Sequence, residues 1–126
     1  MIIIHAVNGH RILPRALRPT LEAVLRSFPV VVVTGSRQTG KSTLVQGLGE
    51  ERRYLTLDDL ETLERAREQP DALVQGLGRL TLDEVQRSPD LLLAVKRAVD
   101  ERRKPGRFLL TGLRTFTFPD HSRVAW

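Results

Sequence analysis

The chain has 126 residues, enough for one domain with one core, and its lack of cysteine excludes a disulfide framework and a thiolate metal site. No stretch approaches the roughly 20 apolar residues that cross a bilayer, and residues 1–5 do not resemble a secretion signal, so we expect a cytoplasmic protein without membrane contact. The formal net charge is +5, and the surplus lies in residues 1–53, which hold eight Lys/Arg and three acids and so favour anionic ligands.

The first half of the chain predicts a helix, a strand and a second helix. Residues 11–27 have the apolar spacing of a short helix, with Pro19 near its start. The apolar run at 30–34 is typical of a strand that is covered on both faces, as in a parallel sheet. Residues 41–48 again have helical spacing, and Gly49 ends that helix.

The turn between this strand and the second helix carries a complete phosphate-loop motif, G-x-x-x-x-G-K-[ST]. Its residues are Gly35, Ser36, Arg37, Gln38, Thr39, Gly40, Lys41, Ser42 and Thr43. A Gly-rich turn that opens a helix aims backbone N–H groups and the helix dipole at one point, where they bind phosphate oxygens. Lys41 can reach the β- and γ-phosphates, and the Ser42 hydroxyl can ligate Mg²⁺. The motif therefore predicts a nucleotide triphosphate site.

The second half of the chain alternates strands and helices. The predicted strands are 54–57, 79–83 and 108–111, and the predicted helices are 58–66, 70–77 and 88–104. Asp58 looks like the N-cap of the first of these helices, with Glu61 completing a capping box, and Ser88 looks like the cap of the last. This alternation predicts an α/β fold in which helices cover both faces of a parallel sheet.

Ligands of such sheets bind at the carboxyl ends of the strands. Thr34, Asp83 and Thr111 all fall at predicted strand ends. Residues 80–84 (LTLDE) look like a Walker B element, in which Asp83 holds Mg²⁺ and Glu84 polarises the water that attacks the γ-phosphate.

Two polar residues near these ends have more than one interpretation. Thr111 is either a sensor of the γ-phosphate or a threonine that forms local hydrogen bonds. Gln86 lies just past the acid pair and is more typical of a polar loop residue than of a contact to nucleotide or to a partner.

Five stretches of the sequence together carry a resemblance to a known family: 13–17 (LPRAL), 31–44 (VVVTGSRQTGKSTL), 57–59 (LDD), 82–92 (LDEVQRSPDLL) and 105–112 (PGRFLLTG). Over residues 11–112 the chain resembles prokaryotic AAA-type ATPases that carry a C-terminal domain of unknown function. The resemblance implies a three-layer P-loop NTPase fold with sheet order 5-1-4-3-2, where strand 30–34 is number one, and Mg-ATP as the ligand. It implies that Lys41 and Ser42 contact phosphate and Mg²⁺, that Asp83 is the Walker B acid and that Glu84 is the catalytic base.

The tail, residues 113–126, does not resemble this family, which continues with a fifth strand, a helical lid and a second domain. We interpret residues 1–126 as one ATP-binding domain, incomplete at its C-terminus and derived from a frameshifted or truncated gene product. Loss of the fifth strand leaves one edge of strand 30–34 unpaired unless residues 115–118, which alternate with period two, pair there. No arginine finger can be named, so we expect weak or absent ATP hydrolysis.

Other functions stay open. The chain could be an inert product, or an interaction module whose basic N-terminal half binds nucleic acid, although no aromatic residues accompany the basic ones. A P-loop kinase is less favoured because Glu84 suits water activation, and a GTPase because no Asn-Lys-x-Asp element occurs. Whether the chain assembles with copies of itself or with a partner protein cannot be read from the sequence.

Overall fold

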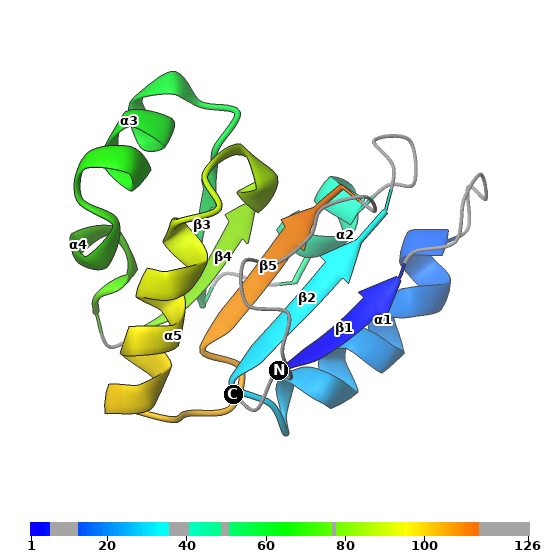
Figure 1. Ribbon diagram of the computed structural model, residues 1–126. Coiled ribbons are helices and arrows are strands. Elements are labelled where there is room, and N and C mark those ends of the chain that lie inside the picture. The colour runs from blue at the N-terminus through cyan, green and yellow to red at the C-terminus, as the bar shows by residue number, and fades with distance from the viewer. Residues whose placement is uncertain (6–12, 36–40, 49–50, 77, 114–126) are drawn as a thin grey trace.

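The computed structural model describes residues 1–5, 13–35, 41–48, 51–76 and 78–113. These residues form a five-stranded parallel sheet with helices on both faces (Figure 1). The strands are β1 (Ile2–His5), β2 (Val30–Thr34), β3 (Arg52–Thr56), β4 (Arg79–Asp83) and β5 (Phe108–Gly112). The helices are α1 (Leu13–Leu25), α2 (Lys41–Gln46), α3 (Leu60–Glu68), α4 (Pro70–Val74) and α5 (Leu91–Glu101), with a 3₁₀ turn η1 (Val85–Arg87). The α/β fold class predicted from the sequence is confirmed.

The strands lie in the order β1-β2-β5-β4-β3, and every neighbouring pair is parallel. Four of them keep the order implied by the family resemblance, with β2 as its first strand. The place implied for a fifth strand, beside β2, is taken by β1, which the sequence analysis did not predict (Figure 1).

The expectation of an unpaired edge on β2 is therefore wrong. Ile2 to His5 pair with Val31 to Thr34, residue by residue. Three consecutive isoleucines explain this pairing, because β-branched side chains pack well on a pleated sheet. Residues 115–118, which we considered as a cover for the same edge, lie outside the described residues.

Alternate residues of β2 pack into two different cores. Val30 and Val32 contact the core on the face of α3, α4 and α5, whereas Val31 and Val33 contact the core on the face of α1 and α2. All four side chains are fully buried. Since both faces of the strand are covered, its sequence is continuously apolar instead of alternating, as predicted.

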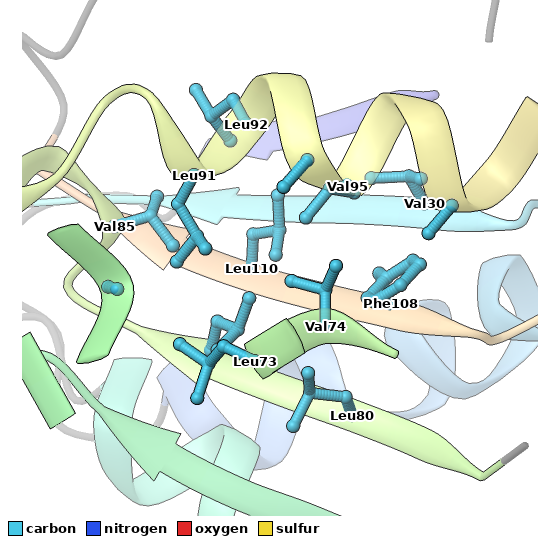
Figure 2. Packing of buried hydrophobic residues seen from close by; sticks show 14 of the residues in the cluster. Val30, Leu73, Val74, Leu80, Val85, Leu91, Leu92, Val95, Phe108 and Leu110 are labelled. Atoms are coloured by element: carbon cyan, nitrogen blue, oxygen red, sulfur yellow. The ribbon is translucent and has the colours of Figure 1, made fainter. Parts of the chain in front are cut away.

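Helix α5 covers the sheet on the first of these faces. Figure 2 shows Leu91 and Val95 of α5 and Val74 of α4 around Phe108 and Leu110 of β5. These five side chains are at most 3% exposed, and burial of each stabilises the fold by about 1.5–3 kcal/mol. No helix of the described residues is long and apolar enough to cross a membrane.

The start of α3 differs from the prediction. Asp59, not Asp58, is the N-cap, because its carboxylate accepts hydrogen bonds from the backbone N–H (3.0 Å) and the hydroxyl (2.9 Å) of Thr62. Asp58 instead forms a 2.8 Å ion pair with Arg87 of η1. The capping box predicted from Asp58 and Glu61 therefore does not form. Asp59 takes the cap position instead, because Thr62, three residues after it, offers both an N–H and a hydroxyl donor.

Three other predicted features also shift. Ser88 does not cap α5, which begins at Leu91 after a turn in which the Leu91 N–H donates to the Ser88 carbonyl at 3.0 Å. Pro19 lies in the interior of α1 instead of near its start. Strand β3 begins two residues earlier than predicted, at Arg52, whose side chain hydrogen-bonds to β4.

Candidate nucleotide site

Three polar residues that the sequence placed at strand ends meet at one edge of the sheet. Thr34 ends β2, Asp83 ends β4, and Thr111 is next to the last residue of β5. Because the strands are parallel, their carboxyl ends share this edge. All three residues are at most 3% exposed, so their polar groups are held by the protein instead of by bulk water.

The phosphate-loop motif begins at the same edge. The Gly35 N–H donates to the Gly112 carbonyl at 3.2 Å, which ties the start of the motif to the end of β5. Residues 36–40 lie outside the described residues, so the contacts expected from Ser36, Arg37, Gln38, Thr39 and Gly40 stay predictions. Lys41 is the first residue of α2 and Thr43 lies on the same helix, but their side chains are also outside the described part.

Ser42 of α2 contacts Asp83 directly. Its hydroxyl lies 3.3 Å and 3.1 Å from the two carboxylate oxygens, across 41 positions of sequence. A hydroxyl that gives its proton to a carboxylate turns its lone pairs to the other side, where they can ligate a cation. These oxygens suit Mg²⁺, which proteins bind through one or two carboxylates, with phosphate and water filling the other positions. The structure thus brings together Ser42 and Asp83, the two residues predicted to bind Mg²⁺.

Two further hydroxyl groups donate to the Asp83 carboxylate. Thr111 donates to Oδ1, and Tyr54 of β3 donates to Oδ2 at 2.6 Å. Gln46, the last residue of α2, donates from Nε2 to the Tyr54 oxygen at 3.1 Å. Partial burial and the hydrogen bond to Asp83 raise the pKa of Tyr54 to about 12, because both disfavour the phenolate.

Glu84, the predicted catalytic base, has an uncommon backbone. Its φ of 62° and ψ of 48° lie in the left-handed region, which costs a residue with a Cβ about 1–2 kcal/mol. Its N–H donates to Thr111 Oγ1 at 3.0 Å, and Gln86 Nε2 donates to its carboxylate at 3.1 Å. Strain of this kind clusters at functional sites, where surrounding contacts hold it in place.

The contacts of Thr111 agree with the local role that the sequence left open. Its hydroxyl accepts from the Glu84 N–H and donates to Asp83, which joins the two acids of the predicted Walker B element. A contact with a γ-phosphate stays a prediction.

The sequence analysis missed the roles of two residues. Gln86, interpreted as a polar loop residue, bridges the Glu84 carboxylate and the Leu113 N–H (3.2 Å). Tyr54 was not singled out. Tyr54 lies opposite Thr81 in the parallel register and is therefore the diagonal neighbour of Asp83 on the same sheet face, a contact that no pattern within β3 marks.

A cavity of about 510 Å³ lies elsewhere, beside the amino ends of β3 and β4. None of the predicted site residues lines it. Arg52 does, and it donates to Thr81 Oγ1 (3.0 Å), the Leu80 carbonyl (3.0 Å) and the Gly106 carbonyl (2.6 Å). Burial, together with the neighbouring Arg79, lowers the pKa of Arg52 to about 10. These contacts explain Arg52 as a structural anchor of the sheet.

Comparison with known proteins agrees with this geometry. Residues 27–118 match the family model described as an AAA domain. Uncharacterized proteins of Mycobacterium bovis (Mb2031c) and Mycobacterium tuberculosis (Rv2008c) are each 38% identical over 94 residues, which cover 73% of this chain and 21% of the relative. The chain thus spans about a fifth of the length of these relatives. No solved structure matches it significantly. The family match indicates a nucleotide-binding function of the AAA type. On the strength of a match over most of its length, the chain belongs to the AAA domain family.

Proposed function

We propose that this chain is the Mg-ATP-binding domain of an AAA-type ATPase and that it hydrolyses ATP weakly or not at all. The observation that carries the proposal is the hydrogen bond between Ser42 and Asp83. It brings the phosphate-loop helix and the acid at the end of β4 within reach of one divalent ion. Neither residue alone is informative, since serine and aspartate are common at helix starts and strand ends.

In this proposal each residue has one task. Backbone N–H groups of 35–43 and the Lys41 ammonium bind the phosphates. Ser42 and Asp83 hold Mg²⁺, which neutralises charge on the β- and γ-phosphates. Glu84 accepts a proton from the attacking water.

The hydrogen bond from Gln86 supports weak hydrolysis. Glu84 is 4% exposed and its carboxylate contacts Gln86, so an attacking water has little room beside this carboxylate. The Glu84 carboxylate must change its contacts before it serves as a base. Binding, in contrast, does not depend on Glu84.

Calorimetric titration with a slowly hydrolysed ATP analogue and Mg²⁺ tests the binding. We expect saturable binding by the intact chain and a loss of about tenfold or more in Lys41→Ala, since a charged hydrogen bond contributes about 1.5–3 kcal/mol. Lys96→Ala is the matched control, because it removes the same charge from the surface of α5. Absence of binding, or equal affinity of the Lys41 and Lys96 variants, contradicts the proposal.

Three further measurements test the finer points. ATP should displace the analogue and GTP should not. Phosphate release by the intact chain should be far below the roughly 1 s⁻¹ at the low end of typical enzymes, and Glu84→Gln should leave nucleotide binding unchanged. Turnover at typical enzyme rates would show that the weak-hydrolysis part of the proposal is wrong.

A further inference from the structure

Helix α2 is attached to the Asp83 carboxylate at both of its ends. Ser42, in its first turn, contacts the carboxylate directly. Gln46, its last residue, reaches the same carboxylate through the hydroxyl of Tyr54. The last three residues of the phosphate-loop motif form the start of α2. The contact of Gln46 with Asp83 through Tyr54 therefore holds the same helix that carries part of the motif.

The direction of the hydrogen bonds in this second attachment is fixed by chemistry. The Gln46 Nε2 group can only donate, and an ionised carboxylate can only accept. The single proton of the Tyr54 hydroxyl must therefore point at Asp83, as the 2.6 Å distance indicates. The donor on the phenol oxygen polarises the hydroxyl and makes it a stronger donor to the carboxylate.

Tyr54 is held in position to make this contact. Its ring packs against the core between the sheet and the helices α1 and α2, while its hydroxyl extends beyond Thr81 to Asp83. The ring and the hydroxyl can thus be separated experimentally, because a phenylalanine keeps the packing and removes only the hydrogen bonds.

We propose that Tyr54 is a positioning residue of the metal site, whose hydroxyl fixes the Asp83 carboxylate relative to α2 and thereby sets the affinity for a divalent ion. This inference rests on the proposed function. Tyr54 (2.6 Å) and Ser42 (3.1 Å) donate to Asp83 Oδ2, while Thr111 and Ser42 (3.3 Å) donate to Oδ1. Without Tyr54, Oδ2 loses its closer donor and keeps the longer contact with Ser42, so the carboxylate is held less firmly. Partners of this kind, which orient a metal ligand, typically change metal affinity by about 10–100-fold.

Tyr54→Phe in the full chain tests the proposal. We measure the Mg²⁺ concentration for half-maximal binding of the slowly hydrolysed ATP analogue, and the affinity for the same analogue in EDTA. The Mg²⁺ midpoint should rise about tenfold, whereas the metal-free affinity should stay the same. Ser27→Ala is the matched control, since it removes a hydroxyl from an exposed turn before the amino end of β2, whereas the site lies at the carboxyl end of that strand.

The outcomes distinguish a failure of the role of Tyr54 from a failure of the proposed nucleotide binding. Normal binding by the unaltered chain with an unchanged Mg²⁺ midpoint in Tyr54→Phe overturns the role of Tyr54 alone. Equal weakening with and without metal also overturns it, because a general structural defect has that signature. No binding by the unaltered chain overturns the proposed function and this inference together.

A second measurement needs no nucleotide. Tyr54 is the only tyrosine of the chain, so isotope-labelled tyrosine gives one NMR signal for the ring carbon that carries the hydroxyl. Asp83→Asn should move this signal toward that of free tyrosine, because a neutral acceptor forms a weaker bond than a carboxylate. Gln46→Ala should move it less. A signal that does not respond to Asp83→Asn shows that the hydrogen bond is absent and overturns the inference.

Discussion

Ile4 of β1 lies directly opposite Val33 of β2, and Val33 lies opposite Thr111 of β5 on its other side. The strand that leads into the phosphate-loop motif is therefore paired along both edges. Its backbone is fixed up to Thr34, whose partners are His5 and Gly112. The N-terminal strand thus helps to hold the position at which the motif begins.

Substitutions in β1 test this pairing. Ile4 packs against the core of α1 and α2, whereas Ile3 is 38% exposed. Because Ile4 is only partly buried, Ile4→Ala should destabilise the chain by about 2 kcal/mol, the low end of the range for isoleucines in cores, and Ile3→Ala by much less. Urea unfolding followed by circular dichroism measures both. Equal effects of the two variants would mean that β1 does not pack on this face.

The corrected cap of α3 gives a second prediction. Asp59→Ala removes the acceptor for the Thr62 N–H and hydroxyl and should cost about 1 kcal/mol of unfolding free energy. Asp58→Ala is the matched control and removes only a half-exposed ion pair with Arg87, which contributes about 0–1 kcal/mol. A larger effect at Asp58 than at Asp59 would restore the cap first expected from the sequence. Thermal unfolding of both variants decides between them.

The fold was largely predictable because its strongest signals are local. The valine run before Gly35 and the acid pair after 80–82 each mark a strand end, and parallel strands carry such ends to one edge. The contact between Ser42 and Asp83 could be expected because Ser42 follows, and Asp83 ends, a strand whose carboxyl end lies at this edge. The three isoleucines of β1 favour a strand, but four residues alone do not reveal which strand they pair with.

The contacts that the sequence analysis missed depend on register between distant strands. Tyr54 reaches Asp83 only because it pairs with Thr81, and no pattern within β3 specifies that partner. Asp58 and Asp59 are equally good caps by residue type, and the choice depends on where the chain leaves β3. Gln86 contacts Glu84, whose backbone is left-handed, and spacing alone reveals neither feature.

Arg52 gives a third prediction. Its guanidinium bridges Thr81 and the carbonyls of Leu80 and Gly106, which a single ammonium cannot do in the same geometry. Arg52→Lys should destabilise the chain by about 1–3 kcal/mol, because buried acceptors lose their donors. Arg53→Lys, one position later, should cost little, since Arg53 is exposed and makes one 3.4 Å bond. Chemical denaturation of the pair checks the difference, and equal stabilities would contradict the anchoring role.

The titration of Tyr54 gives a fourth prediction. Its pKa in the folded chain is about 12, above the ordinary value of 10. A group with a raised folded pKa stabilises the fold below its unfolded pKa, and the contribution is lost as the pH rises from 10 through 12. The ultraviolet absorbance of tyrosinate should thus appear above pH 10, and Asp83→Asn should lower the midpoint. Circular dichroism at each pH shows whether the chain is still folded, and a midpoint at or below 10 in the folded chain contradicts the prediction.

The last prediction concerns the hydroxyl of Thr111, which joins the two acids of the site. Thr111 is fully buried, and its oxygen accepts from the Glu84 N–H while its proton goes to Asp83. Thr111→Val keeps the shape and removes both bonds, so a buried N–H loses this acceptor at a cost of about 1–3 kcal/mol. Thr111→Ser keeps both bonds and loses one methyl group, at a cost of about 0.5–1.5 kcal/mol.

The comparison between these two variants isolates the hydroxyl from the packing. If the hydroxyl holds the left-handed Glu84, Thr111→Val should be the less stable variant in urea unfolding and should also bind the ATP analogue more weakly in the presence of Mg²⁺. The weaker binding follows because Asp83 loses one of its three hydroxyl donors. If Thr111→Val matches the unaltered chain in both measurements, the hydroxyl contributes neither to the backbone of Glu84 nor to the orientation of Asp83.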